Sequence, residues 1–259
     1  MTARPTKFRL AWELIFALSA VAALVAWYAS LARDGLPSPG GFVGHLLGVV
    51  GFALMLCTEL VYTLRKRLRR FTAGSMRFWL QVHIFTGLVG PSLVLLHTGG
   101  KFHGLAGVVS LLTVLMVASG FVGRYIYTAA PRDLTGMELN VAELEQQLAA
   151  ADRELCRLGP VAAPTVSVPP AWWAVLARPW LHWRQSRLLT AARSAGPEAE
   201  RVAGLLAARE RLRLQVACLL GARRLLALWH LFHIPLGAVL FTLASLHIVA
   251  ALYYSTLSR

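Results

Sequence analysis

The sequence is poor in charged residues and in cysteine. Only 15% of its 259 residues are charged and 57% are hydrophobic, which is more apolar surface than a soluble domain of this size would bury. The cysteines Cys57, Cys156 and Cys218 lie too far apart for a CxxC pair, a zinc site of familiar spacing or the CxxCH motif of covalent haem attachment. The first apolar run, residues 10–32, is too long for the core of a cleavable leader, so we expect a retained helix. These features predict an integral membrane protein.

Long apolar runs are abundant instead. Five windows of about 20 residues or more could each cross a bilayer as a helix. They are residues 10–32, 42–64, 78–98, 105–128 and 225–255. We therefore predict an all-α, polytopic membrane protein with four transmembrane helices in residues 1–129, a cytoplasmic arm in 130–224 and a fifth transmembrane helix in 225–259.

Basic residues outnumber acidic ones by 26 to 12, but they gather beside the apolar runs. The segment RKRLRRFTAGSMR between the second and third runs holds six Arg or Lys residues, whereas the loops RDGLPSPGG and GGKFHG hold one each. Such asymmetry is typical of membrane orientation and needs no nucleic-acid partner. It predicts a cytoplasmic N-terminus and an outer C-terminus, and we expect the location to be a bacterial inner membrane.

The arm carries two apolar stripes at the spacing of packed helices. The stripes are Val141, Leu144, Leu148, Ala151, Leu155 and Leu158, then Val202, Leu205, Leu212, Val216 and Leu219. They predict a cytoplasmic helical hairpin, joined by a Trp- and Arg-rich connector typical of a membrane surface. We interpret the arm as a structural hairpin that extends the fifth helix, in preference to a docking or catalytic role.

Two apolar runs begin and end on histidine at the same interval. HIFTGLVGPSLVLLH covers His83 to His97, and HIPLGAVLFTLASLH covers His233 to His247. Fourteen helical residues separate two side chains by about 40° around the axis and about 21 Å along it. Because the third and fifth helices are predicted to run in the same direction, His83 should lie level with His233, and His97 with His247.

A single histidine in a transmembrane helix is more often a buried structural residue than a ligand, but four at matched depths favour a cofactor. Ionisable residues are costly in a membrane, and two neutral imidazoles that face one another suit the axial positions of a haem iron. The four histidines therefore predict two stacked b-type haems inside a four-helix bundle. Filled axial positions favour electron transfer over activation of dioxygen.

Glycines and cations near these histidines are further candidate haem contacts. Gly87 and Gly237 each lie four residues after the first histidine of a run, where a missing Cβ would admit a flat macrocycle, although glycine also serves helix packing. Arg77, Lys101 and Arg124 lie near the two levels and could pair with haem propionates. For both arginines, membrane orientation is an equally good explanation.

The remaining histidines of the helices are weaker candidates. His230 lies seventeen residues before His247, which turns it about 100° away from a common face. His45 and His103 fall near the predicted outer surface, where an interfacial role is the simpler interpretation. We expect none of the three to bind iron.

The four-histidine pattern resembles that of the di-haem membrane cytochromes b, a group that includes respiratory cytochrome b and the haem cores of ferric reductases and NADPH oxidases. In that group, two helices each carry two ligating histidines at about this spacing. The resemblance covers the third and fifth helices and the four-helix arrangement around them. It implies two haem b groups as cofactors, with His83, His97, His233 and His247 as ligands.

The resemblance implies transmembrane electron transfer between a quinone or cytoplasmic partner and an acceptor on the outer face. The sequence has no GxGxxG unit for a nicotinamide or flavin domain, so electrons should come from a quinol or from another subunit. We expect a redox subunit with partner subunits on one or both faces rather than a stand-alone enzyme. Two alternatives stay open: a haem-free scaffold or transporter whose histidines bind metal or protons, and a stand-alone ferric or superoxide oxidoreductase.

Overall fold

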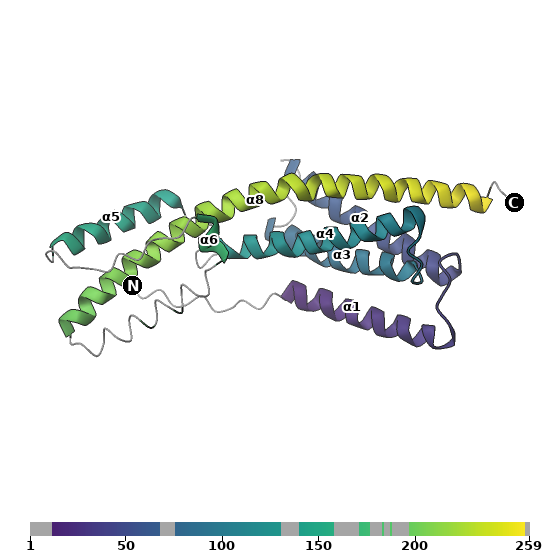
Figure 1. Cartoon of the computed structure of the whole chain (residues 1–259), viewed down its shortest axis with the longest axis horizontal. Coiled ribbons are helices and arrows are strands. Elements are labelled where there is room, and N and C mark those ends of the chain that lie inside the picture. Colours follow the sequence, from purple (N-terminus) through teal and green to yellow (C-terminus); the bar gives the residue numbers. More distant parts are fainter. Residues whose placement is uncertain are drawn as a thin grey trace. The chain divides into compact units, whose positions relative to one another are not determined.

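The computed structural model describes residues 12–67, 76–130, 140–157, 171–176, 183, 187 and 197–256, and the regular elements in these ranges are all helical (Figure 1). They are α1 (Trp12–Leu31), η1 (Ala32–Asp34), α2 (Phe42–Arg67), α3 (Met76–His97), α4 (Gly104–Ala129), α5 (Val141–Arg157), α6 (Ala171–Leu176) and α8 (Pro197–Thr256). Helices α1 to α4 and α8 are long and apolar enough to cross a membrane. The chain is therefore an all-α membrane protein with five candidate spans, as predicted.

Helix α8 is much longer than the predicted fifth span. It runs for 60 residues from Pro197 to Thr256 and passes the predicted boundary at 224/225 without a break. Proline suits the first turn of a helix, and the next proline of the chain is Pro235. A change from polar to apolar side chains leaves the backbone hydrogen bonds intact, so the arm and the span share one helix.

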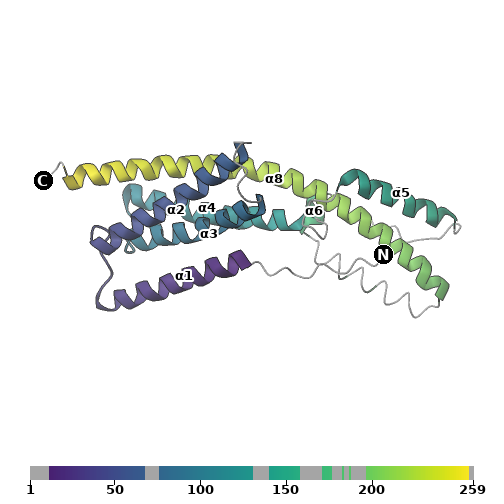
Figure 2. The ribbon, with the colours of Figure 1, turned by 180° about the vertical axis from the view of Figure 1, so that it is seen from behind.

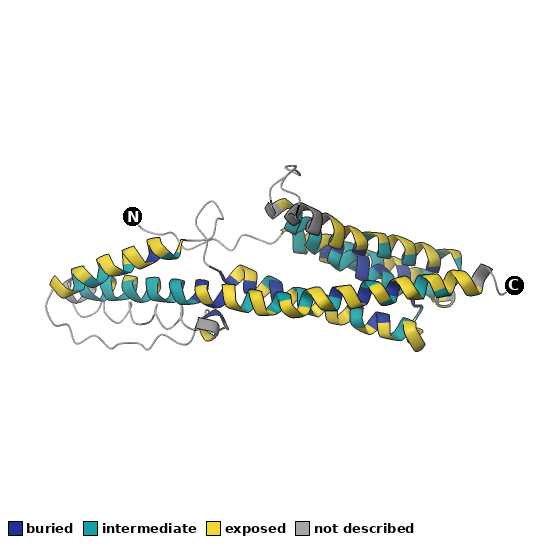
Figure 3. Cartoon of the chain, turned by 90° about the horizontal axis from the view of Figure 1, so that it is seen from above, coloured by how far each residue is buried: buried dark blue, intermediate teal, exposed yellow. Residues whose placement is uncertain are grey.

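The chain divides into two compact units, and the first comprises residues 1–121 and 233–259. In its described part, α2, α3, α4 and the last part of α8 surround a common apolar core, and Figure 3 shows buried positions along these helices. The buried members of this core are Met55, Val109, Leu240 and Ala244. Leu240 is only 1% exposed, and Phe52 lies 6.1 Å from Phe241 between ring centroids. These contacts form the four-helix bundle that the sequence predicted.

Helices α2 and α3 approach one another closely in this unit. A Cβ added to Gly51 would lie 2.9 Å from the carbonyl oxygen of Gly90, and a Cβ added to Gly90 would lie 3.0 Å from that of Gly51. Paired small residues of this kind let helix backbones approach closely within a membrane. Helix α1 adds a second core, in which Tyr28 is buried with Leu47 and Leu93.

The two loops predicted to face outward lie together at one end of this unit. A Cβ on Gly99, in the turn after α3, would lie 2.8 Å from the carbonyl oxygen of Pro37, in the loop before α2. Gly99, Gly100 and Gly104 have φ values of 56°, 79° and 57°, which glycine adopts without strain. The glycines thus allow the sharp reversal from α3 into α4.

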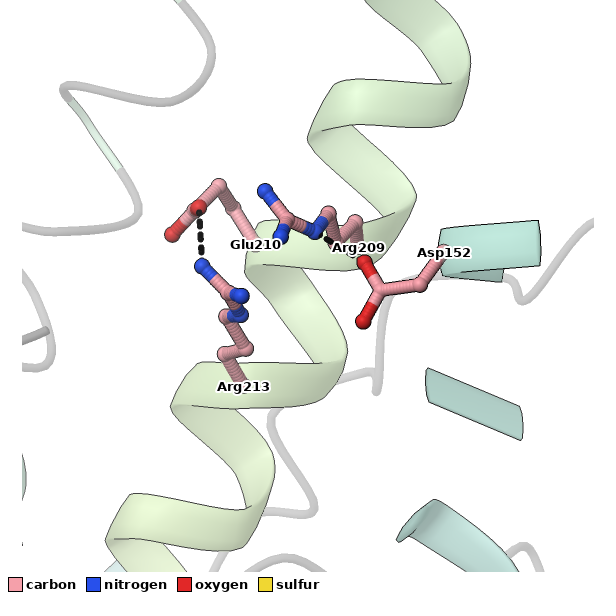
Figure 4. A network of polar contacts seen from close by, with 4 residues as sticks. All are labelled: Asp152, Arg209, Glu210 and Arg213. Carbon is pink, nitrogen blue, oxygen red and sulfur yellow. Dashed lines mark hydrogen bonds and ion pairs between the residues drawn. The ribbon is translucent and has the colours of Figure 1, made fainter. Parts of the chain in front are cut away.

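The second unit comprises residues 122–232. The end of α4, α6 and part of α8 share a core that includes Ile126, Val175 and Ala222. Helix α5 lies beside the first part of α8 in Figures 1 and 2, and Figure 4 shows the ion pair between Asp152 and Arg209 that joins them.

The Trp- and Arg-rich connector is described only in part. Trp173 and Trp183 are exposed, and the guanidinium of Arg187 lies 4.8 Å from the centre of the Trp183 ring. Exposed tryptophan beside arginine is typical of a membrane surface. The rest of the predicted interfacial segment lies outside the described residues.

Candidate functional site

His97, at the end of α3, is held by helix α2. Its Nδ1 lies 2.8 Å from the carbonyl oxygen of Gly44. A carbonyl can only accept, so Nδ1 carries the proton and donates it, which leaves the lone pair of Nε2 for another ligand. The ring lies against Gly48, where an added Cβ would come within 3.1 to 3.3 Å of three ring atoms. Two glycines of α2 therefore set the position and the tautomer of His97.

His247, on α8, lies near His97. The two imidazoles are close enough to interact electrostatically. This proximity is consistent with the predicted pairing of His97 with His247, which stays a prediction. Among the described residues, no hydrogen bond is found for the His247 ring, so it differs from its neighbour in having no anchor there.

His83, fourteen residues before His97 on α3, is also held by α2. Its Nδ1 donates to the carbonyl oxygen of Thr58 at 3.2 Å, so the ring nitrogen that carries the lone pair is again Nε2. The Thr58 hydroxyl donates to the Thr86 hydroxyl at 2.7 Å, which links the two helices at the same place. The Glu59 carboxylate is close enough to interact electrostatically with the His83 ring.

His233, on α8, is paired with a side chain of α4. Its Nδ1 lies 3.0 Å from the hydroxyl oxygen of Ser119. A hydroxyl can donate or accept, so this bond permits the proton on Nδ1 with Ser119 accepting. In that tautomer His233, like His83 and His97, offers Nε2 as a ligand.

The four histidines thus fall into two levels along the bundle. Each run places its two histidines about 21 Å apart along a continuous helix. The core around Met55, Leu240 and Ala244 fills the space between the levels with apolar side chains. All four histidines are half-buried.

Among the described residues, His45, His103 and His230 show no such cross-helix bonds. His45 and His230 bond through Nδ1 to the carbonyl oxygens of Gly41 and Leu226, each four residues earlier in the chain. His103 is exposed in the turn before α4. These contacts agree with the interpretation that the three histidines are interfacial or neighbouring residues.

The predicted glycines face helix contacts. A Cβ on Gly87 would lie 3.5 Å from the Thr58 methyl group on α2, and one on Gly237 would lie 3.1 Å from the terminal methyl group of Met116 on α4. Both glycines therefore lie where helices pack, which is the alternative role named from the sequence. Their contact with a macrocycle stays a prediction.

The predicted cations are less well defined. Lys101 is exposed in the turn after α3, and Arg124 belongs to the second unit. Arg77 lies in the first turn of α3, but its side chain lies outside the described residues. Propionate pairing by all three stays a prediction.

The partners of the histidines, Gly44, Gly48, Thr58 and Ser119, were not predicted from the sequence. Gly44 and Gly48 do form a GxxxG pattern, which could have indicated close approach of a neighbouring helix. Gly44 and Thr58 accept through their backbone carbonyls, and the identity of a side chain does not indicate such a role. Ser119 is one hydroxyl among several in α4, and only the fold puts it beside His233.

The donor set fits a haem better than a free metal ion. Within the described ranges, no group of three or more His, Cys, Asp and Glu side chains could hold a metal ion. A haem supplies the equatorial nitrogen ligands of its iron and takes only axial ligands from the protein, for which paired neutral imidazoles are suitable. Fixing Nδ1 on a carbonyl or hydroxyl is also how metal-binding histidines are commonly oriented.

Known proteins offer no closer guide to this site. Comparison with protein-family models, with curated proteins and with solved structures gives no match for the chain. The choice of a ligand for the four histidines therefore rests on the geometry of the site itself.

Proposed function

We propose that the chain is a di-haem b-type cytochrome that carries electrons across a membrane. One observation carries this proposal: His83, His97 and His233 each have Nδ1 hydrogen-bonded to a neighbouring helix, which is how imidazoles that bind a metal through Nε2 are commonly oriented. Together with the proximity of His97 and His247, these bonds favour two levels of paired imidazole ligands. The resemblance to di-haem membrane cytochromes b supports the same function.

Each level has a defined task for the residues around it. A haem held by two imidazoles supplies a one-electron Fe(III)/Fe(II) couple with both axial positions filled. His97 and His247 would hold the outer group, and His83 and His233 the inner group. The apolar layer around Leu240 would keep water from the path between them. The helical spacing of about 21 Å keeps both levels within one bilayer thickness.

The proposal includes an orientation and partners. The helices indicate a lipid bilayer, and the charge asymmetry favours a bacterial inner membrane with the N-terminus cytoplasmic and the C-terminus outside. Electrons would enter from a quinol or a cytoplasmic partner and leave to an acceptor on the outer face, through partner subunits on one or both faces. Lys101, Arg77 and Arg124 are the proposed propionate contacts.

Haem content and ligand variants test the proposal. Purified protein should give two equivalents of haem b in the pyridine haemochrome assay, and His97→Ala and His247→Ala should each give one. His45→Ala and His230→Ala are matched controls, because both rings bond along their own helix, and they should keep two. Full haem content in the ligand variants would contradict the proposal.

The same preparation separates the alternatives. A colourless protein would favour a haem-free scaffold or transporter. Membranes that reduce ferric chelates or turn over superoxide without any partner subunit would favour a stand-alone oxidoreductase. Reduction that requires quinol or an added subunit is the result we expect.

A further inference from the structure

We propose that Ser119 and the Thr58 carbonyl make the inner level the harder of the two to reduce, an inference that rests on the proposed function. The two levels differ in how many of their imidazoles are anchored through Nδ1. At the inner level both rings have such a bond, His83 to Thr58 at 3.2 Å and His233 to Ser119 at 3.0 Å. At the outer level, the described part of the chain gives such a bond to His97 but not to His247.

A bond from Nδ1 matters because it changes what Nε2 donates. When Nδ1–H donates to an oxygen, electron density shifts toward Nε2 and the imidazole becomes a more basic ligand. A more basic axial ligand stabilises Fe(III) relative to Fe(II), so the midpoint potential falls. Two such bonds at the inner level lower its potential more than one bond lowers that of the outer level.

The charge near the inner level acts in the same direction. The Glu59 carboxylate interacts electrostatically with the His83 ring. A negative charge near the ring favours the more positive oxidation state. Around His97 the described contacts are the uncharged Gly44 and Gly48, with His247 as its neighbour.

Ser119 is the residue through which this difference can be changed. It bonds His233 through its side chain, whereas Thr58 accepts through its backbone and keeps that bond when its side chain is replaced. It is a positioning residue, since it would act on the iron only through the imidazole. Ser119→Ala removes the hydroxyl and leaves the helix backbone unchanged.

The test is a spectroscopic redox titration of the purified di-haem protein. The inner component is identified as the one that His97→Ala retains, and in the unaltered protein it should have the lower midpoint. Ser119→Ala should raise that midpoint by roughly a tenfold change in the reduction equilibrium, about 59 mV for one electron, with the outer component unmoved. Ser119→Thr keeps a hydroxyl and should restore the value.

Ser110→Ala is the matched control. Ser110 lies on the same helix and its hydroxyl donates to the carbonyl of Ala106, so neither component should move. An inner component with the higher midpoint, or a Ser119→Ala protein with two haems and unchanged potentials, would overturn the inference while the proposed function stands. Protein without haem would overturn the proposed function itself.

Discussion

Gly48→Ala is the substitution whose effect on the outer level can be worked from the structure. The new Cβ would lie 3.1 to 3.3 Å from Nδ1, Cγ and Cε1 of His97, whereas relaxed contacts of this kind are about 3.5 to 4.0 Å. The ring must therefore move by a few tenths of an ångström. Its bond to Gly44 is 2.8 Å long, toward the short end of the normal range, so the displacement would stretch or tilt it.

The expected magnitude follows from this crowding. Overpacking at a well-filled contact costs about 1–3 kcal/mol, which corresponds to a roughly 5- to 150-fold loss of affinity for the outer haem. The assay is haem content after graded dilution in detergent, together with the low-spin electron paramagnetic resonance signal of each haem. We expect the outer signal to shift or to be lost first, with the inner signal intact.

Gly204→Ala supplies the control for this experiment. Gly204 lies within α8, and no described atom lies within 4 Å of its added Cβ, so the change only improves helix propensity. Its haem content and signals should match those of the unaltered protein. If Gly48→Ala behaves in the same way as Gly204→Ala, His97 is not seated on α2 as the structure describes.

Three further changes test the packing. Gly51→Ala puts a Cβ 2.9 Å from Gly90, Leu93 and Val94, and should lower thermal stability in detergent by about 1–3 kcal/mol; an unchanged melting temperature would refute the close α2–α3 contact. Tyr28→Phe removes a buried hydroxyl that has no partner among the described residues, and should stabilise the protein by about 1 kcal/mol, whereas a loss of stability would show that the hydroxyl is bonded. Asp152→Asn breaks a partly exposed ion pair with Arg209 and should cost less than about 1 kcal/mol without changing haem content; loss of haem would tie the arm to the histidine levels.

The helices were largely predictable, because their signal is local. Runs of apolar residues long enough to span a bilayer put the first four helices within a few residues of their observed bounds. The largest difference is at the end of α2, which was predicted at residue 64 and lies at Arg67. The fifth span was predicted to start at residue 225 because the apolar window of spanning length begins there. The backbone hydrogen bonds of a helix continue across a change from polar to apolar side chains, so α8 begins earlier, at Pro197.

The only part of the site that could be predicted was the separation of histidines on one helix, which follows from their spacing in the sequence. Fourteen residues on a helix fix the separation of His83 and His97 without any knowledge of their neighbours. The bonds that orient the rings depend on which carbonyl or hydroxyl a neighbouring helix presents, and that requires the helices to be packed first. Gly44 and Ser119 could therefore be identified only from the fold.

The most direct test of the central claim is the number of haem b groups bound by the purified chain. A pyridine haemochrome assay with a reduced-minus-oxidised visible spectrum should give two equivalents per chain, with one lost in His97→Ala and one in His247→Ala. A colourless protein, or ligand variants that keep both equivalents, would contradict the assignment of the four histidines.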